Sequence, residues 1–266
     1  MRVGFYQFVP AFGDVKRNLD VVATKLLQVS CDLMVLPELF ATGYQFLSQE
    51  ETESLAEPVP EGPTTARLIE IAKSRQMFLV GGLPERHEGR CYNSAVLVGP
   101  AGFLGVYRKA HLFYEETIVF SPGDTGFQVW DIGVAKVGLL ICFDWIYPEA
   151  ARTLTLLGAE ILCHPSNLVL PHCPDAMVTR CLENRVFSIT ANRIGFDQRG
   201  DKERLTFIGN SEIVSPRGRI LYRASGDRED LAVVDIDPAE ARNKALNHYN
   251  DLVRDRRPDL YRLGSG

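Results

Sequence analysis

Apolar runs and segments of helical period alternate over the first third of the chain. Three short apolar runs predict strands: residues 3–8, 33–36 and 78–81. Between them, residues 15–28 and 64–75 predict helices, the second with apolar side chains at intervals of three at Ala66, Ile69 and Ala72. Alternation of strand and helix indicates an α/β fold.

The middle of the chain breaks this alternation. Four strands follow one another, with Gly and Pro turns and no helix between them: residues 94–98, 104–107, 126–131 and 136–142. Helix and strand then alternate again: residues 148–158, 160–164, 174–183 and 187–192. Strands at 207–215 and 219–224 form a predicted hairpin through Ser215-Pro216-Arg217-Gly218, and a strand at 231–236 precedes a helix from Pro238.

No feature divides the sequence into separate domains. It contains no Ser/Gly linker, no low-complexity stretch and no repeat of 20–50 residues. We therefore predict one domain over residues 1–266. The charged and aromatic tail at 247–266 is too short to form a core of its own, so we expect it either to lie at a subunit interface or to be solvated.

Composition excludes several classes of function. The chain has 266 residues, of which 45% are hydrophobic, with 29 Lys and Arg against 34 Asp and Glu and a net charge of −5. Such a chain can bury a large core without disulfides or metals. The acidic balance, with a pI of about 5.6, disfavours nucleic acid and anionic membranes as partners.

The first residues and the cysteines suggest a compartment. The opening residues lack the 7–15-residue apolar stretch of a secretory signal, and no window approaches 18 consecutive apolar residues. We therefore expect a soluble, cytoplasmic protein whose cysteines are free thiols. There are six: Cys31, Cys91, Cys142, Cys163, Cys173 and Cys181.

Three predicted strands end in groups that could together perform acyl transfer. Glu38, Lys109 and Cys142 follow or end apolar runs, where open α/β sheets gather their ligand sites. A lysine ammonium near a cysteine lowers the thiol pKa and stabilises the oxyanion formed when sulfur attacks a carbonyl or nitrile carbon. A desolvated carboxylate can move the proton. We expect the sulfur at an exposed bend, with the Phe143 N–H completing the oxyanion hole.

Other functions fit the sequence less well. Cys163-His164 and His172-Cys173 could supply zinc ligands, but their spacing is not typical, and adjacent strand residues point to opposite faces. The glycines of Gly81-Gly82-Leu83-Pro84 lack the spacing of a phosphate loop. A binding protein that keeps the fold without the chemistry would not explain the three titratable strand ends.

The chain resembles the nitrilase superfamily of carbon–nitrogen hydrolases, whose signature is a Glu, Lys, Cys triad. Four segments carry the resemblance in order: Leu36-Pro37-Glu38 with Thr42-Gly43-Tyr44, Tyr107-Arg108-Lys109-Ala110-His111-Leu112, Pro122-Gly123-Asp124, and residues 138–144 leading to Pro148-Glu149. The resemblance implies an αββα sandwich, a homodimer stacked as αββα–αββα, a cysteine thioester mechanism and no metal or organic cofactor. It also implies a second carboxylate, which by position is Glu116 rather than Glu115.

The residues around the predicted nucleophile favour one branch of this superfamily. Phe143-Asp144 follows Cys142 where nitrilases carry Trp-Glu, so the similarity is to the amidase-like branches. We expect hydrolysis of small linear amides to an acid and ammonia, with nitriles or N-carbamoyl amines as alternatives. Trp145 and Tyr147 are candidates to line the substrate pocket, and Asn167 to donate to a substrate oxygen. Arg180 and Arg193 are candidate cations for a substrate carboxylate, but the sequence does not place them.

Overall fold

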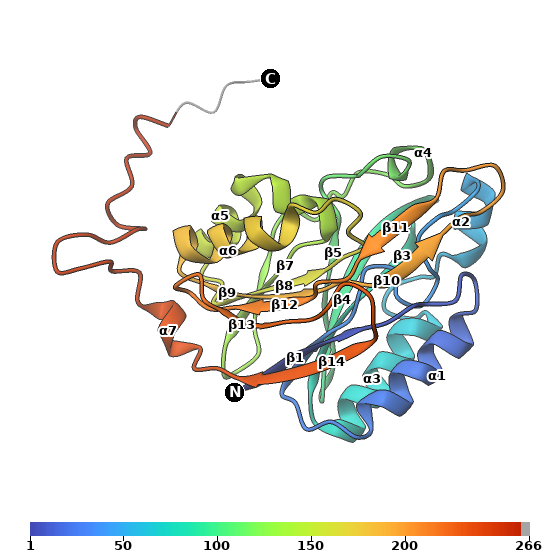
Figure 1. Ribbon diagram of the computed structural model, residues 1–266, viewed down its shortest axis with the longest axis horizontal. Coiled ribbons are helices and arrows are strands. Elements are labelled where there is room, and N and C mark those ends of the chain that lie inside the picture. Colours follow the sequence, from blue (N-terminus) through green and yellow to red (C-terminus); the bar gives the residue numbers. More distant parts are fainter. Residues whose placement is uncertain (262–266) are drawn as a thin grey trace.

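The computed structural model describes residues 1–261 as two six-stranded sheets between pairs of helices (Figure 1). The first sheet contains six strands in this order: β14 (Asp230–Asp235), β1 (Arg2–Gln7), β2 (Leu33–Val35), β3 (Phe78–His87), β4 (Arg90–Gly99) and β5 (Gly102–Arg108). Strands β1, β2 and β3 run parallel, and the other pairings are antiparallel.

The second sheet repeats the same mixture of pairings. Its order is β13 (Ile220–Arg223), β12 (Glu212–Val214), β9 (Phe187–Ala191), β8 (Ile161–Pro165), β7 (Lys136–Leu139) and β6 (Val129–Asp131). Strands β7, β8 and β9 are parallel. In both sheets the parallel strands are those that the sequence separates by helices, because a parallel pair needs a crossover connection.

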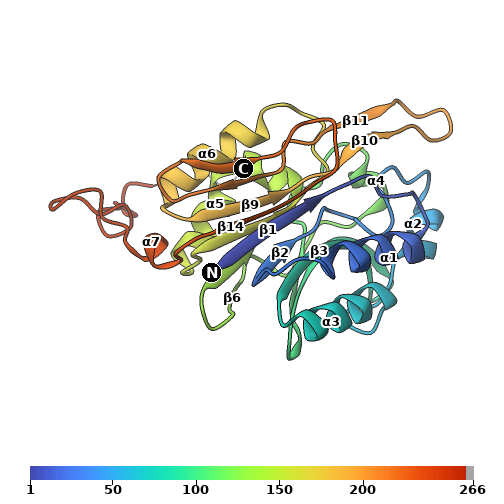
Figure 2. The same cartoon turned by 60° about the horizontal axis from the view of Figure 1, so that its bottom comes forward.

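Four helices cover the two outer faces. Helices α1 (Val15–Leu26) and α3 (Pro63–Arg75) lie on the first sheet, and α5 (Pro148–Leu156) and α6 (Cys173–Asn184) lie on the second (Figures 1 and 2). On β1, Val3 and Phe5 belong to the core cluster shared with the second sheet, whereas Tyr6 packs with α1 and α3. This period of two is what a strand buried on both faces requires. The predicted α/β class and the αββα layers are confirmed.

The remaining elements lie outside these four layers. They are α2 (Gln49–Leu55), α4 (Glu116–Val119), the 3₁₀ helix η1 (Cys142–Ile146), the hairpin strands β10 (Ile194–Asp197) and β11 (Leu205–Ile208), and α7 (Ala239–Arg242). In both views the β10–β11 hairpin projects at the end opposite α7 (Figures 1 and 2).

Several predicted boundaries were wrong. The strand predicted at 207–215 breaks into β11 and β12, because Gly209 and Asn210 between them have φ angles of 59° and 54°. The strand predicted at 136–142 ends at Leu139. The helix predicted from Pro238 is the four-residue α7, and the sequence did not predict α2, α4 or β10.

The tail leaves the body of the protein after α7. Residues 243–261 follow an irregular path away from the sheets, and the last five residues of the predicted 247–266 tail lie outside the described residues (Figure 1). Its place at a subunit interface stays a prediction. All six cysteines are free thiols, as expected, and all six are buried. Within residues 1–261 no helix is long and apolar enough to span a membrane.

Candidate active site

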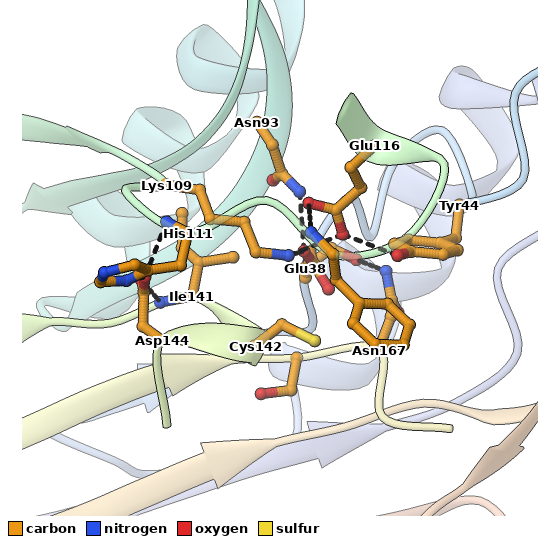
Figure 3. A network of polar contacts seen from close by, with 12 residues as sticks. Glu38, Tyr44, Asn93, Lys109, His111, Glu116, Ile141, Cys142, Asp144 and Asn167 are labelled. Atoms are coloured by element: carbon orange, nitrogen blue, oxygen red, sulfur yellow. Dashed lines mark hydrogen bonds and ion pairs between the residues drawn. The ribbon is translucent and has the colours of Figure 1, made fainter. Parts of the chain in front are cut away.

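The three titratable strand ends meet at one end of the sandwich. Glu38 follows β2 and Lys109 follows β5 in the first sheet, and Cys142 follows β7 in the second. The Nζ atom of Lys109 lies 2.7 Å from Oε1 of Glu38 and 2.6 Å from Oε1 of Glu116. Figure 3 shows these three side chains converging, with the sulfur of Cys142 directed toward them. The structure therefore brings together the four residues that the sequence selected.

Glu38 is fully buried with one oxygen occupied and one free. Its Oε1 accepts hydrogen bonds from Lys109 and from Nδ2 of Asn93, the latter at 2.7 Å. Its Oε2 is buried and has no partner among residues 1–261. Burial raises the pKa of Glu38 to about 7, with Lys109 opposing the rise and Glu116 adding to it. This carboxyl can both accept and return a proton near neutral pH.

Gly82 allows the backbone of Glu38 to lie where it does. A Cβ atom at Gly82 would come within 2.6 Å of both Glu38 Cα and Leu39 N. The Gly82 N–H also donates to the carbonyl of Pro37, and its carbonyl accepts from Phe40. Gly81-Gly82, which we had weighed as a phosphate loop, thus serves a close backbone approach beside the base.

Lys109 is held by its backbone and by its two carboxylates. Its N–H donates to the carbonyl of Asn93 at 2.8 Å, and its own carbonyl accepts from Gly123 at 2.9 Å. Burial acts to lower the pKa of Lys109, but Glu116 and Glu38 outweigh burial and raise it. An ammonium has three N–H donors, and the two ion pairs use two of them. The third is available for an oxygen of a substrate.

Glu116 opens α4 and is fixed from two sides. Tyr44, in the loop after Glu38, donates its hydroxyl hydrogen to Oε1 of Glu116 at 2.6 Å. Glu115 instead pairs with Lys202 at 2.8 Å. The assignment of the second carboxylate to Glu116 therefore agrees with the geometry. Tyr44 belongs to a quoted motif, but the sequence analysis gave it no role.

Cys142 begins η1 in a left-handed backbone conformation. Its φ angle is 42°, which is uncommon for a residue with a Cβ and is typical of sharp turns at functional sites. The residue is only 4% exposed, so the expected exposed bend was wrong. Burial raises the pKa of the Cys142 thiol well above 9, with Glu38 and Glu116 adding to the rise and Lys109 opposing it. Lys109 does not hold this sulfur as a thiolate, because burial together with the two carboxylates outweighs the effect of its charge.

Asp144 fixes the turn that carries Cys142. Its carboxylate is fully buried and accepts from the backbone N–H of Ile141 at 2.9 Å and from the hydroxyl of Tyr107 at 2.8 Å. It also accepts from the backbone N–H of His111 and contacts Nδ1 of that residue at 2.8 Å. Asp144 therefore links the end of β5 to the nucleophile turn, a role that sequence reasoning missed although the residue lay within a quoted motif.

His164 supports the same turn from the second sheet. Its Nε2 lies 2.9 Å from the carbonyl oxygen of Cys142, and because a carbonyl only accepts, Nε2 carries the proton. Its Nδ1 contacts the hydroxyl of Thr190 at 3.1 Å. Burial lowers the pKa of His164 to about 4, so the imidazole is neutral.

Within residues 1–261 no three His, Cys, Asp or Glu side chains are grouped to hold a metal ion.

A small recess opens beside the sulfur. Eight residues line it: Phe113, Cys142, Phe143, Trp145, Asn167, Leu168, Val169 and Leu170. Tyr147 is not among them, because its ring stacks on His111 with centroids 3.7 Å apart. The Phe143 N–H lies in the first turn of η1 and has no partner in the described chain, so its place in an oxyanion hole stays a prediction.

The two arginines that the sequence could not place are already paired. Arg193 is fully buried and binds Asp197 through two hydrogen bonds of 3.0 Å. Arg180 donates to the carbonyl of Trp145 and to Glu183. Neither lines the recess. The described chain thus gives the recess no charged side chain.

Comparisons with known proteins show the family of this chain. The carbon-nitrogen hydrolase family matches residues 3–245. A nitrilase of Pyrococcus abyssi (strain GE5 / Orsay) is 45% identical over 264 residues, covering 98% of this chain and 99% of that protein. An (R)-stereoselective amidase of Pseudomonas sp. is 37% identical, with 97% and 92% covered.

Solved structures of a related amidase also match this chain. A double mutant of the amidase from Nesterenkonia sp. AN1 in complex with acrylamide superimposes with a TM-score of 0.80 at 27% identity, covering 98% of this chain and 95% of that one. Another structure of that amidase shows the product of Michael addition of acrylamide at its active-site cysteine. The chain belongs to the nitrilase superfamily and is a carbon–nitrogen hydrolase with an active-site cysteine.

Proposed function

We propose that the protein hydrolyses small linear amides to a carboxylic acid and ammonia through a thioester on Cys142. The observation that carries this proposal is the buried ammonium of Lys109, ion-paired at 2.7 and 2.6 Å to two carboxylates beside the thiol. In the proposal Cys142 is the nucleophile, Glu38 the base and acid, and Lys109 the oxyanion donor. Glu116 positions Lys109.

The first half-reaction forms the thioester. Sγ of Cys142 attacks the amide carbon while its proton passes to the free oxygen of Glu38, and the Lys109 ammonium stabilises the developing oxyanion. The C–N bond then breaks, and Glu38 returns the proton to the departing nitrogen, which leaves as ammonia. A raised thiol pKa suits this order because the proton moves together with the attack rather than before it.

The second half-reaction releases the acid. A water molecule attacks the thioester carbon, Glu38 takes its proton, and the C–S bond breaks with the proton returning to sulfur. These steps use side chains and water alone.

The free, buried cysteines also support our expectation of a reducing, cytoplasmic compartment.

The recess favours a small and uncharged acyl group. Apart from Cys142 and Asn167, the side chains that line it are apolar or aromatic. A substrate with a distal carboxylate, such as an ω-amide or an N-carbamoyl acid, would need a cation there. Nitriles are the second candidate, because a 45% identical relative is a nitrilase. N-carbamoyl amines are a further alternative.

Ammonia release from matched substrates tests the proposal. We expect the protein to release ammonia from propionamide faster than from propionitrile or an N-carbamoyl amine. Mass spectrometry should detect an acyl adduct that Cys142→Ala abolishes and that Cys181→Ala, which removes another fully buried thiol, retains. Hydrolysis that persists in Cys142→Ala would refute the mechanism, and faster release from the nitrile would replace the proposed substrate.

A further inference from the structure

Asn167 lies against the nucleophile. It follows β8 in the second sheet, is 2% exposed and lines the recess together with Cys142. Its backbone N–H lies near enough to the sulfur of Cys142 to lower the pKa of that thiol, against the larger rise from burial. Figure 3 shows its side chain beside Glu38 at the edge of the cluster. Any substrate bound at the sulfur therefore comes close to Asn167.

The orientation of the Asn167 amide is fixed by its partner. Its Nδ2 donates to the backbone carbonyl of Glu38 at 2.9 Å, and a carbonyl oxygen can only accept. The nitrogen must therefore face Glu38, and Oδ1 is left as the other end of the group. This Oδ1 is buried and has no partner in the part of the chain that the structure describes.

The backbone N–H groups on either side of Asn167 donate to other partners, so neither of them donates to this oxygen. The N–H of Ser166 donates to the carbonyl of Ala191 at 2.8 Å, and the N–H of Leu168 donates to Oδ1 of Asn192 at 2.8 Å. The carbonyl of Leu168 accepts from Ile208 at 3.0 Å. Oδ1 is thus an acceptor held in place before any substrate arrives, the condition under which one hydrogen bond contributes most to selection.

We propose that Asn167 determines specificity by accepting a hydrogen bond from the N–H group of a primary amide. This inference rests on the proposed function and deepens it. A buried acceptor without a partner is unfavourable, and a substrate N–H removes that penalty. A nitrile or an ester of the same acyl group has no N–H at the corresponding atom and leaves Oδ1 unpaired. Sites built around such a bond discriminate strongly against analogues that lack it.

The contact also suits the chemistry of bond cleavage. With one N–H bound to Oδ1, the substrate nitrogen is oriented while Glu38 transfers the proton taken from Cys142 to it. The C–N electron pair becomes the lone pair of the leaving ammonia. The assignment reverses our sequence-based expectation for Asn167, which was to donate to a substrate oxygen, because its amide nitrogen already faces Glu38.

The test combines a change of residue with a change of substrate. We would measure kcat/KM, which reports the steps through acylation, for propionamide and methyl propionate in the wild type and in Asn167→Leu. We expect the amide-to-ester ratio to fall at least about tenfold in the variant, since the bond to the amide alone is lost. Equal losses for both substrates would overturn the inference, leaving Asn167 as a positioning residue for Glu38.

Asn93 provides a matched control. It is a buried asparagine that also donates to Glu38 through Nδ2, and among residues 1–261 its Oδ1 also has no partner, but it does not line the recess. Asn93→Leu should therefore lower both rates by one common factor and preserve the ratio. A ratio that falls as much in Asn93→Leu would contradict the assignment, because disturbance of Glu38 would then explain both variants.

A binding measurement keeps the inference testable if Asn167→Leu does not fold. Calorimetry on Cys142→Ala should show propionamide binding at least about tenfold more tightly than propionitrile. Equal affinities would overturn the role of Asn167. A failure of the proposed function gives a different result. The wild type would then release no ammonia from propionamide, and the inference about Asn167 would be refuted as well.

Discussion

Glu38 is the residue whose ionisation state should control the rate. It must be ionised to take the thiol proton, and burial raises its pKa from the usual carboxyl value to about 7. Between pH 4.5 and 7 an ordinary surface carboxylate would already be charged, but Glu38 is still largely protonated. Activity that requires the charged form is therefore lost as pH falls through 7 rather than through 4.5.

The first prediction follows from this pKa. We expect kcat/KM for propionamide to be level above about pH 7.5 and to fall tenfold per pH unit well below 7, as measured by ammonia release across a pH series. Glu212→Gln is the matched control, since burial also raises the pKa of Glu212 to about 7 but this residue lies on β12, outside the recess. A midpoint near 4.5, or one that shifts in Glu212→Gln, would contradict the assignment to Glu38.

At this scale the sequence predicted the reactive groups but not the groups that hold them. Glu38, Lys109 and Cys142 could be selected because they end apolar strands. Tyr44 and Asn93 could not, since their partners Glu116 and Glu38 are 72 and 55 residues away along the chain. A pattern that reports local structure carries no information about such pairs. Burial of the sulfur was hidden for the same reason, because segments from both sheets cover it.

At the scale of elements, the β10–β11 hairpin holds the loop that carries Tyr44. Asp197 accepts from the backbone N–H groups of Tyr44 and Gln45, both at 3.3 Å, and is itself bound by the buried Arg193. The hairpin loop adds Lys202, whose Nζ lies 2.8 Å from the carbonyl of Phe46 and from Glu115. These contacts fix both the loop after Glu38 and the start of α4, so the hairpin sets the distance between Tyr44 and Glu116.

The second prediction concerns this hairpin. Lys202→Met should lower kcat/KM about fivefold, equivalent to ~1 kcal/mol for a partly exposed ion pair, by loosening Glu116 and hence Lys109. Hydrogen exchange should become faster at residues 44–46 and 115–117. Arg204→Met is the control, since Arg204 belongs to the same loop but stacks on the exposed ring of Phe196, 3.8 Å from its centroid. Equal losses in both variants would show that the hairpin acts only through general stability.

The hairpin also shows which kinds of element the sequence did not predict. The long helices and the parallel strands have clear periodicity, and α1, α3, α5 and α6 were all found. β10 has only four residues, and the strand predicted over 207–215 joined Phe207-Ile208 to Ile213-Val214 across the break between β11 and β12. Asn210 adopts its left-handed backbone because Gly209 and Ser211 are bonded to other segments. Those segments are distant in sequence, so the local pattern gives no sign of them.

At the scale of the whole molecule, the two sheets supply different groups of the site. The first supplies the base and the ammonium, and the second supplies the nucleophile and Asn167. Core side chains between the sheets keep these strand ends in register, since interiors packed at crystal-like density have few alternative arrangements. Substrate access therefore depends on loops at one end, while the outer faces of the helices are free for other uses.

The outer face formed by α5 and α6 exposes several large apolar side chains. Leu156, Leu157 and Leu182 are 41, 52 and 49% exposed, and Ile146 nearby is 41% exposed. The tail that starts after α7 makes most of its hydrogen bonds within itself and leaves Tyr249 almost wholly exposed. Apolar patches of this kind on a folded protein mark contact surfaces, and a two-fold axis would let the same face serve both subunits.

The third prediction is a homodimer formed through this face and the tail. Light scattering after size-exclusion chromatography should give about twice the 29.7 kDa chain mass at micromolar concentration. Leu157→Glu, or deletion of residues 247–266, should shift the protein toward monomer, because a buried unpaired carboxylate or a lost segment weakens the contact. Leu27→Glu, at the end of α1 on the opposite helical layer and 60% exposed, should leave the mass unchanged. A monomeric wild type, or dissociation in Leu27→Glu alone, would exclude this interface.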